Sequence, residues 1–311
     1  MSATGVCAAA PHRDRPLHTI LQAAAPLPHT TRCGHYTVGP LCCLPYADSV
    51  EFTAEIIGFL IAVAFIAGAI DAVAGGGGLL TVPALLAAGA SPAAALGTNK
   101  LQSTFGVATA VITFARKGRI NFRRFAGPAL AAFFGAVGGA IVLTRIDPTI
   151  LSGLIPLLLV AMAIYYALKP NLSDEDRHVR ARPILLLAFA VAIGFYDGFF
   201  GPGAGSFYTT ALIAVFGLGT VNAIAHTKLL NFSSNVASLI VLMSAGEVLL
   251  VAGLLMAAAS MAGAFLGAHS AMRFGTKVVR PLLIIMCLAL TARLLWDPSN
   301  PLTALVLSWL E

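Results

Sequence analysis

The sequence predicts an all-α polytopic membrane protein with about ten transmembrane segments, arranged as two inverted repeats of five with short broken helices at the centre. Composition is the first reason for this prediction. Of 311 residues, 58% are hydrophobic and only 10% are charged, and the mean hydropathy is +0.88, whereas about a quarter of the residues in a soluble domain are charged. The second reason is a succession of apolar runs, and the third is a repeat within the chain.

The apolar runs begin after residue 51, and Gly, Pro or charged residues separate each run from the next. Backbone groups in lipid must form their hydrogen bonds internally, and these runs lack the alternation of barrel strands, so we expect helices. The predicted segments are approximately 54–74, 78–90, 97–115, 126–144, 149–168, 183–200, 204–217, 226–243, 247–270 and 278–296.

The second half of the chain repeats the first. An offset of 126 aligns one aspartate and two glycines, in the pairs Asp71 with Asp197, Gly75 with Gly201 and Gly77 with Gly203. An offset of 128 aligns further residues, in the pairs Gly89 with Gly217, Lys100 with Lys228, Gly135 with Gly263, Gly139 with Gly267 and Arg145 with Arg273. Charged residues that fall in register with the glycines indicate a duplication.

Five segments in each repeat would turn the second copy upside down, and the basic residues agree with this. The connection "RKGRINFRR" is basic while its counterpart "SAGE" is acidic, and "MRFGTKVVR" is basic while its counterpart "TRIDP" is balanced. The positive-inside bias then places both basic connections and the basic central one in the cytoplasm, with both termini outside. The alternative is that segments 78–90 and 204–217 are re-entrant, which gives eight crossings and parallel repeats but leaves "MRFGTKVVR" outside.

These boundaries divide the chain into five parts. Residues 51–170 form the first transmembrane repeat, 171–182 a cytoplasmic linker loop, 183–298 the second repeat and 299–311 a C-terminal tail. Residues 1–50 contain no run long enough to span a membrane, and we expect a disordered extension or one that follows from a wrongly assigned start codon. The five cysteines show no metal-binding spacing, so neither a metal nor another cofactor is expected.

Two of the segments are unusually short and lie at corresponding places in the two halves. "LLTVPALLAAGA" follows four glycines, and "SFYTTALIAVFG" follows "GPGAG". Such interrupted segments are the best sequence indication of a transporter's central site. Glycines allow the backbone to unwind and expose amide N–H groups that bind anions. The candidate substrate-binding glycines are Gly75, Gly76, Gly77, Gly78, Gly201 and Gly203.

The lysines indicate the sign of the ligand. We expect Lys100 and Lys228 each to open a segment directly after hydroxyl or amide residues, so that a cation, a helix N-terminus and neutral donors can converge on a small oxyanion. The candidate substrate-binding residues are Lys100, Lys228, Thr98, Asn99, Gln102, Thr227 and Asn231, and the same polar set includes Ser103, Ser234 and Asn235. The alternative is structural neutralisation, in which Lys100 pairs with Asp71 and Lys228 with Asp197.

Asp71, Asp197 and His226 are candidates for carrying a coupling proton. Burial favours the neutral form of a carboxyl group, which allows it to exchange protons at physiological pH. A purely structural role for the aspartates is an equal alternative. His226 is the weaker candidate, because a buried histidine with satisfied hydrogen bonds is the more common case, and we expect the same of His269.

At these residues the chain resembles a known family. "GAIDAVAGGGGLLTVPALLAAGASPAAALGTNKLQSTFGVATAVITFARKGRINF" is similar to the first repeat of the TauE/SafE sulfite exporters, also called sulfonate uptake permeases, and "GFYDGFFGPGAGSF" through "HTKLLNFSSNVASLIVL" to the second. The resemblance covers residues 52–296. It implies a secondary transporter of sulfite, thiosulfate, sulfonates, sulfoacetate or related anions. The second copy departs from the first at Pro202 and at His226–Thr227, so we expect an asymmetric site.

The expected partners are a small anionic solute and membrane lipid, with no nucleic acid, and assembly as a homodimer is allowed. The expected location is the inner, cytoplasmic membrane, with several crossings. An anion channel is the main rival, because the same broken helices and lysines can line a pore. An intramembrane enzyme built on Ser206 and His226 is a weaker rival, since the nucleophile motif "GxSxG" is absent from the sequence. A membrane assembly factor is another weaker rival. No enzymatic activity is expected.

Overall fold

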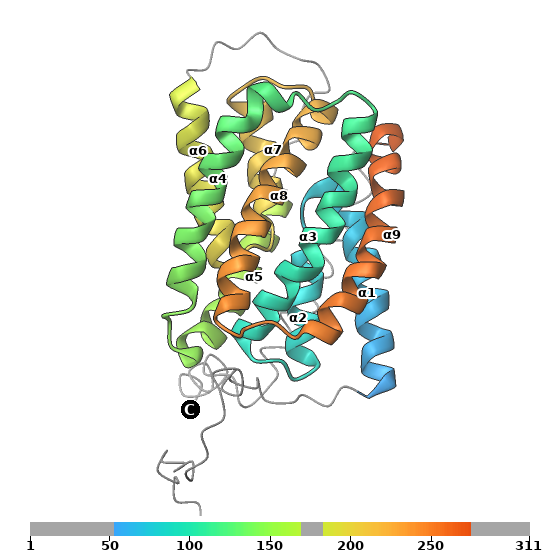
Figure 1. The fold of residues 1–311 in the computed structure, drawn as a ribbon, viewed down its shortest axis with the longest axis vertical. Coiled ribbons are helices and arrows are strands. Elements are labelled where there is room, and N and C mark those ends of the chain that lie inside the picture. Colours follow the sequence, from blue (N-terminus) through green and yellow to red (C-terminus); the bar gives the residue numbers. More distant parts are fainter. Residues whose placement is uncertain (1–52, 169–182, 275–311) are drawn as a thin grey trace, which may run out of the picture. The chain divides into compact units, whose positions relative to one another are not determined.

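The computed structural model describes residues 53–168 and 183–274, and within these ranges every regular element is an α-helix (Figure 1). The helices are α1 Ala54–Ala74, α2 Gly78–Ala87, α3 Pro92–Arg116, α4 Phe122–Leu143, α5 Pro148–Leu168, α6 Pro183–Phe199, α7 Ala204–Ala214, α8 Thr220–Ser244 and α9 Leu250–Phe274. The predicted segment at 278–296, the N-terminal extension, the linker loop and the C-terminal tail lie outside the described residues.

Two helices begin earlier than the sequence predicts. The segment expected at 97–115 is α3, which starts at Pro92 behind the N-cap Ser91, and the segment expected at 226–243 is α8, which starts at Thr220. Serine at the N-cap followed by proline is a strong start signal, because the serine oxygen accepts a free backbone N–H and proline needs none. Lys100 and Lys228 therefore lie inside their helices and do not open them.

The helices of the two halves are interleaved. α1 packs along α9, and α4 packs along α6 in the same way, while α3 contacts α9 and α8 contacts α4. α3 and α8 also contact each other near the middle of the bundle. Each long contact therefore joins a helix from one half of the chain to a helix from the other.

Corresponding helices run in opposite directions in Figure 1. α1 ascends and α6 descends, α3 ascends and α8 descends, and α4 descends and α9 ascends. The α3–α4 connection consequently lies at the upper end of the bundle and the α8–α9 connection at the lower end.

Glycines permit the close contacts between these long helices. A methyl group at Gly139 of α4 would overlap the backbone of Phe195 in α6, and one at Gly267 of α9 would overlap the backbone of Ala69 in α1. Small residues at such positions let helices approach closely in lipid, where van der Waals packing replaces the hydrophobic effect. The repeat seen in the sequence therefore reappears as a repeat of helix contacts.

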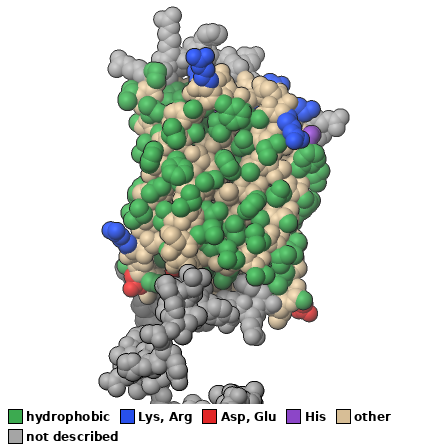
Figure 2. Space-filling view, in the orientation of Figure 1, with side chains coloured by type: hydrophobic (Ala, Val, Ile, Leu, Met, Phe, Trp, Pro, Cys, Tyr) green, Lys and Arg blue, Asp and Glu red, His purple; other side chains and the backbone are tan. Residues whose placement is uncertain are grey.

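The outer surface has the character of a membrane protein. α1, α4 and Leu250–Ser270 of α9 are long and apolar enough to span a membrane. Large apolar side chains point outward, as with Phe134 at 69% exposure and Val251 at 73%, and Figure 2 shows such side chains covering the visible side of the bundle. α2 is different: its core residues are almost completely buried, as expected of a helix that is apolar all round.

Charge gathers at the two ends of the bundle. The α3–α4 connection carries basic residues on an exposed surface, and Figure 2 shows Lys and Arg at this upper end. At the lower end, Asp147 accepts the backbone N–H of Thr149 at 2.7 Å, which lowers the pKa of its carboxyl group. Glu247 is partly buried in the α8–α9 connection, and desolvation raises the pKa of its carboxyl group.

Candidate functional site

The two glycine motifs interrupt the chain at the centre of the bundle. α1 ends at Ala74, Gly75 takes the left-handed conformation with φ +78°, and α2 begins at Gly78. α6 ends at Phe199, and Gly203 caps α7 with φ +85°. Only glycine adopts these angles without strain, so the sequence motif marks breaks between helices and does not weaken a continuous one.

The two breaks lie against each other. A side chain at Gly75 would overlap the backbone of Gly205, so the chains approach here more closely than any other residue allows. Ser206 at the start of α7 donates its hydroxyl to the carbonyl of Ala74, the last residue of α1, at 2.6 Å. Tyr196 donates its hydroxyl to Pro202 inside the second break at 2.8 Å. Carbonyl groups freed by the breaks are thereby partly satisfied within the protein.

Two ion pairs connect the halves of the chain at these breaks. Lys100 Nζ lies 2.6 Å from Asp197 Oδ1, and Lys228 Nζ lies 3.2 Å from Asp71 Oδ2. The within-half pairing that the sequence offered as an alternative, Lys100 with Asp71 and Lys228 with Asp197, is not the one that forms. Because α3 contacts α8 and the halves are interleaved, each lysine meets the aspartate of the opposite half.

The two pairs have different surroundings. Asp197 is 2% exposed and also accepts a hydrogen bond from Ser234, while Lys100 also donates to Asn235 Oδ1 at 3.1 Å. In the other pair, Asp71 is 18% exposed. Gly106 stands in the repeat where Ser234 stands, and Val107 where Asn235 stands. The second copy therefore supplies polar partners that the first copy lacks, and one pair is sealed while the other is partly open.

Asp71 also contacts the glycine motif that follows it in the chain. Asp71 Oδ1 accepts the backbone N–H of Gly77 at 3.2 Å, and Lys228 donates to the carbonyl of Asp71 as well as to its carboxylate. Within the described residues, these two aspartates and two lysines are the charged residues in the interior of the bundle. The remaining described charges lie at helix ends and connections.

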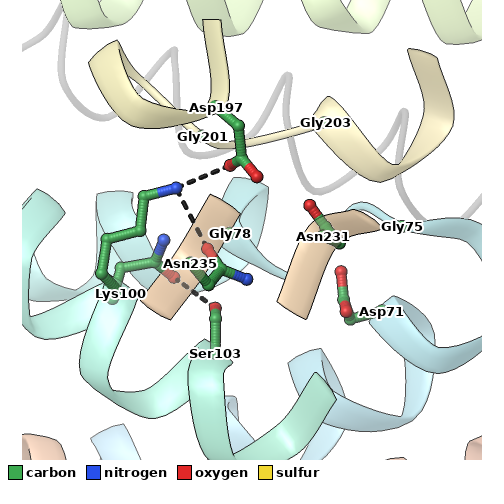
Figure 3. A pocket seen from close by; sticks show the side chains of 11 residues that line it. Asp71, Gly75, Gly78, Lys100, Ser103, Asp197, Gly201, Gly203, Asn231 and Asn235 are labelled. Carbon is green, nitrogen blue, oxygen red and sulfur yellow. Dashed lines mark hydrogen bonds and ion pairs between the residues drawn. The ribbon is translucent and has the colours of Figure 1, made fainter. Parts of the chain in front are cut away.

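A small polar cavity lies between the breaks. The centre of a water molecule can occupy a volume of about 20 Å³ in it. This is room for about one water. Figure 3 shows Lys100, Asp197 and Asn235 on one side and Asn231 and Asp71 on the other. The lining residues are Asp71, Gly75, Gly78, Asn99, Lys100, Ser103, Asp197, Gly201, Gly203, Asn231 and Asn235.

The lining follows from helical spacing. Ser103 lies one turn after Lys100 in α3, and Asn231 and Asn235 lie at successive turns after Lys228 in α8, so each set faces one side of its helix. Ser103 and Asn235 belong to the polar set seen in the sequence but not to the substrate-binding candidates. Their spacing of three and seven residues from the lysines is the signal that could have selected them.

Several predicted binding residues lie elsewhere. Thr98 accepts the backbone N–H of Leu249 at 3.0 Å, and Gln102 donates to Ser260 in α9 at 2.6 Å. Thr227 accepts the hydroxyl of Thr209 at 3.1 Å. These side chains join helices to each other and do not line the cavity. Gly76, Gly77 and Lys228 also lie outside its lining, although Gly77 and Lys228 both contact Asp71.

Neither histidine belongs to the cavity. His226 Nε2 accepts the backbone N–H of Asn121 at 3.1 Å, Nδ1 lies 2.7 Å from the Asn222 carbonyl, and the ring stacks on Phe125. The expected satisfied, buried histidine is therefore found at this position, at the start of α4. For His269 the expectation of burial is wrong, because its side chain is exposed on α9 with Nδ1 2.8 Å from the Phe265 carbonyl.

The site can therefore offer both signs of charge and both kinds of hydrogen-bonding group. Lys100 Nζ is the cationic donor, the break amides are neutral donors, and the carboxylates and the Asn231 carbonyl are acceptors. The cavity has room for about one water, so a multi-atom anion does not fit in this conformation.

Comparison with known proteins identifies the family. The chain matches the family described as "Sulfite exporter TauE/SafE" over residues 60–294. It belongs to this family. Proteins similar to this one include "Probable membrane transporter protein ORF9" of Sinorhizobium sp, 46% identical over 80% of this chain and 95% of that one. A "Probable membrane transporter protein" of Haemophilus influenzae is 41% identical over 78% and 96% of the two chains.

A third relative, "Probable membrane transporter protein YfcA" of Escherichia coli K12, is 40% identical over 78% of this chain and 90% of that one. No solved structure matches the chain. The expected family is thus confirmed, and the protein is a membrane transporter of the TauE/SafE type.

Proposed function

We propose that the protein is a secondary transporter of small sulfur-containing or organic anions, such as sulfite, thiosulfate, sulfonates or sulfoacetate, in the inner (cytoplasmic) membrane. It works by proton-coupled alternating access and is not an enzyme. The observation that carries the proposal is the pair of crossed Lys–Asp contacts at the two glycine breaks. Ionisable groups in the middle of membrane helices are costly, so their presence indicates a pathway for solute or protons.

The proposed architecture is ten crossings in two inverted repeats. Its support is that corresponding helices run in opposite directions and exchange the same contacts, α1 with α9 as α6 with α4. A two-fold relation of this kind gives two conformations that differ in which half closes the path.

In the proposed mechanism, the anion binds between Lys100 and the amides of the broken helices. The anion replaces Asp197 as the counter-ion of Lys100. In the present conformation the 2.6 Å contact between Lys100 and Asp197 blocks this binding. Because each ion pair joins the two halves, opening the cavity separates the pairs, and an anion and a proton can compensate the charges that are exposed.

The proposal is tested by anion binding to the purified protein. Sulfite, thiosulfate, sulfoacetate, taurine and sulfate are titrated against thermal unfolding in detergent, since a ligand at a hundred times its Kd stabilises the folded state by about 2.7 kcal/mol. We expect at least one anion to raise the unfolding temperature. The charge-balanced variant Lys100→Met/Asp197→Asn should fold but lose this response.

Two results would contradict the proposal. One is that no anion stabilises the protein beyond the general effect of salt, and the other is that the double variant retains wild-type affinity. Counterflow in proteoliposomes separates the carrier from the rival anion channel: a carrier exchanges labelled for unlabelled anion against a gradient and saturates, whereas a channel does neither.

A further inference from the structure

Asn231 carries a buried acceptor for which the described residues supply no donor. The side chain is 5% exposed, lines the cavity, and has no hydrogen-bond partner at Oδ1. An unsatisfied buried carbonyl costs about 1–3 kcal/mol. Such a group in a native site indicates a water, an ion or a proton donor that joins it.

Two of the groups that face Asn231, the carboxylates of Asp71 and Asp197, are also acceptors. Figure 3 shows Asn231 and Asp71 on the same side of the cavity, with Asp197 and Lys100 across from them. A carboxylate and an amide oxygen can share this space only with a donor between them. Lys100 already donates to Asp197 and Asn235, and Lys228 to Asp71.

A proton on Asp71 can supply that donor, directly or through the one water for which the cavity has room. Asp197 is a poor host because it is 2% exposed, which leaves protons little access to its carboxylate. Asp71 is 18% exposed, so protons can reach it. A metal cation is disfavoured because the ammonium groups of both lysines contact these carboxylates. Because both side chains line the same cavity, a protonated Asp71 has an O–H that can satisfy Asn231 Oδ1.

The net charge of the site then determines the charge of the anion that can bind together with the proton. Two aspartates and two lysines sum to zero, and one proton on Asp71 leaves a single uncompensated positive charge. A monovalent anion restores zero, and a net charge at this depth is costly. We propose that the cavity loads a monovalent anion only together with one proton held between Asp71 and Asn231, so that each transport step carries no net charge.

This inference rests on the proposed transport function and adds the site and stoichiometry of the coupling ion. It is tested in proteoliposomes with labelled methanesulfonate, which keeps one negative charge across the working pH range. A membrane potential of about 60 mV changes the free energy of moving one uncompensated anion across the membrane by about 1.4 kcal/mol. This would change the equilibrium accumulation of the anion about tenfold. We expect no response to a potassium–valinomycin potential of either sign, and tenfold accumulation for one unit of pH gradient with the acid side outside.

The opposite result separates the two proposals. Saturable counterflow with accumulation that follows the potential at equal pH overturns this inference but leaves the transport function standing. Absence of saturable flux for methanesulfonate and for every anion of the binding panel overturns both.

Variants locate the proton. Asp71→Asn keeps the site neutral at this position at every pH, so we expect uptake that follows the potential and ignores the pH gradient. Asn231→Leu removes the acceptor, and we expect the loss of pH-driven accumulation. Asn231→Ser is the matched control, because Ser103 stands at the corresponding place in the first half and a hydroxyl can accept the same bond. If Asn231→Leu folds and keeps the wild-type pH dependence, Asn231 does not hold the proton.

Discussion

Lys100 is 1% exposed in the middle of α3 and has a charged partner only because Asp197 comes from the other half of the chain. Removing one member of a buried ion pair is more damaging than removing both, because the survivor is left charged and unsolvated. The same logic applies to Lys228 and Asp71, although the partial exposure of Asp71 reduces the effect.

Partner-specific rescue should follow from this pairing. Lys100→Met is expected to destabilise the protein by about 3 kcal/mol, and adding Asp197→Asn should restore the unfolding temperature in detergent. The matched control, Lys100→Met/Asp71→Asn, should be worse than the single variant, because it leaves Asp197 and Lys228 both unpaired. Equal rescue by the two second substitutions would contradict the crossed pairing.

For single residues, the sequence indicates which side chains are unusual in a membrane helix more reliably than it indicates which residues they contact. Asp71, Lys100 and the glycines stand out because they oppose an apolar background. Spacing along one chain cannot tell whether Lys100 meets Asp71 or Asp197, since that depends on how the halves pack. Gln102 and Thr98 illustrate the same limit: a polar residue in a membrane helix can bind either solute or a neighbouring helix, and here both side chains bond a neighbouring helix or its start.

The long helices depend on close backbone contact, as α4 and α6 illustrate. Gly139 of α4 lies against the backbone of Phe195, which cannot move aside, whereas a methyl group at the neighbouring Gly138 would meet only the ring edge of Phe195 at an ordinary 3.6 Å. The two adjacent glycines therefore differ in what they permit.

This difference gives a paired test. Gly139→Ala should destabilise the protein by about 1–3 kcal/mol through overpacking. Gly138→Ala should be neutral or stabilising by up to about 1 kcal/mol, because alanine has less freedom to lose in a helix. Unfolding temperatures of the two variants in detergent decide the matter, and an equal effect would mean that α4 and α6 are not held at backbone contact.

Most helices could be predicted from the apolar runs, because a run bounded by glycine, proline or charge leaves few alternatives in lipid. The starts of α3 and α8 could not, because "GTNK" and "HTK" resemble a break in hydropathy. Within the helix, Thr98 and Thr227 satisfy their hydroxyls on Leu249 and Thr209, so no break is needed.

For the whole molecule, the direction of each half is the property that transport depends on. The exposed residues Lys117 and Ala245 lie in the connections after α3 and α8, at opposite ends of the bundle. In a background without the native cysteines, Lys117→Cys should react with an impermeant thiol reagent only from the cytoplasm and Ala245→Cys only from outside. Labelling of both from one side would favour parallel repeats.

The interleaving of the halves could be predicted only in part. The offset of the repeat and the reversal of charge indicate inversion, but nothing in the sequence states that α1 packs on α9 and α4 on α6. That arrangement follows from glycines such as Gly139 and Gly267, whose neighbours are visible only in three dimensions.

The crossed ion pairs also set an order of events while the ribosome is still at work. Lys100 emerges 97 residues before Asp197, and Asp71 emerges 157 residues before Lys228. At about 5–20 residues per second, synthesis leaves each waiting for roughly 5–30 s. During that interval the newly inserted first half holds a lysine and an aspartate without their final partners, so it depends on the insertion machinery or on water to shelter them until the second half arrives.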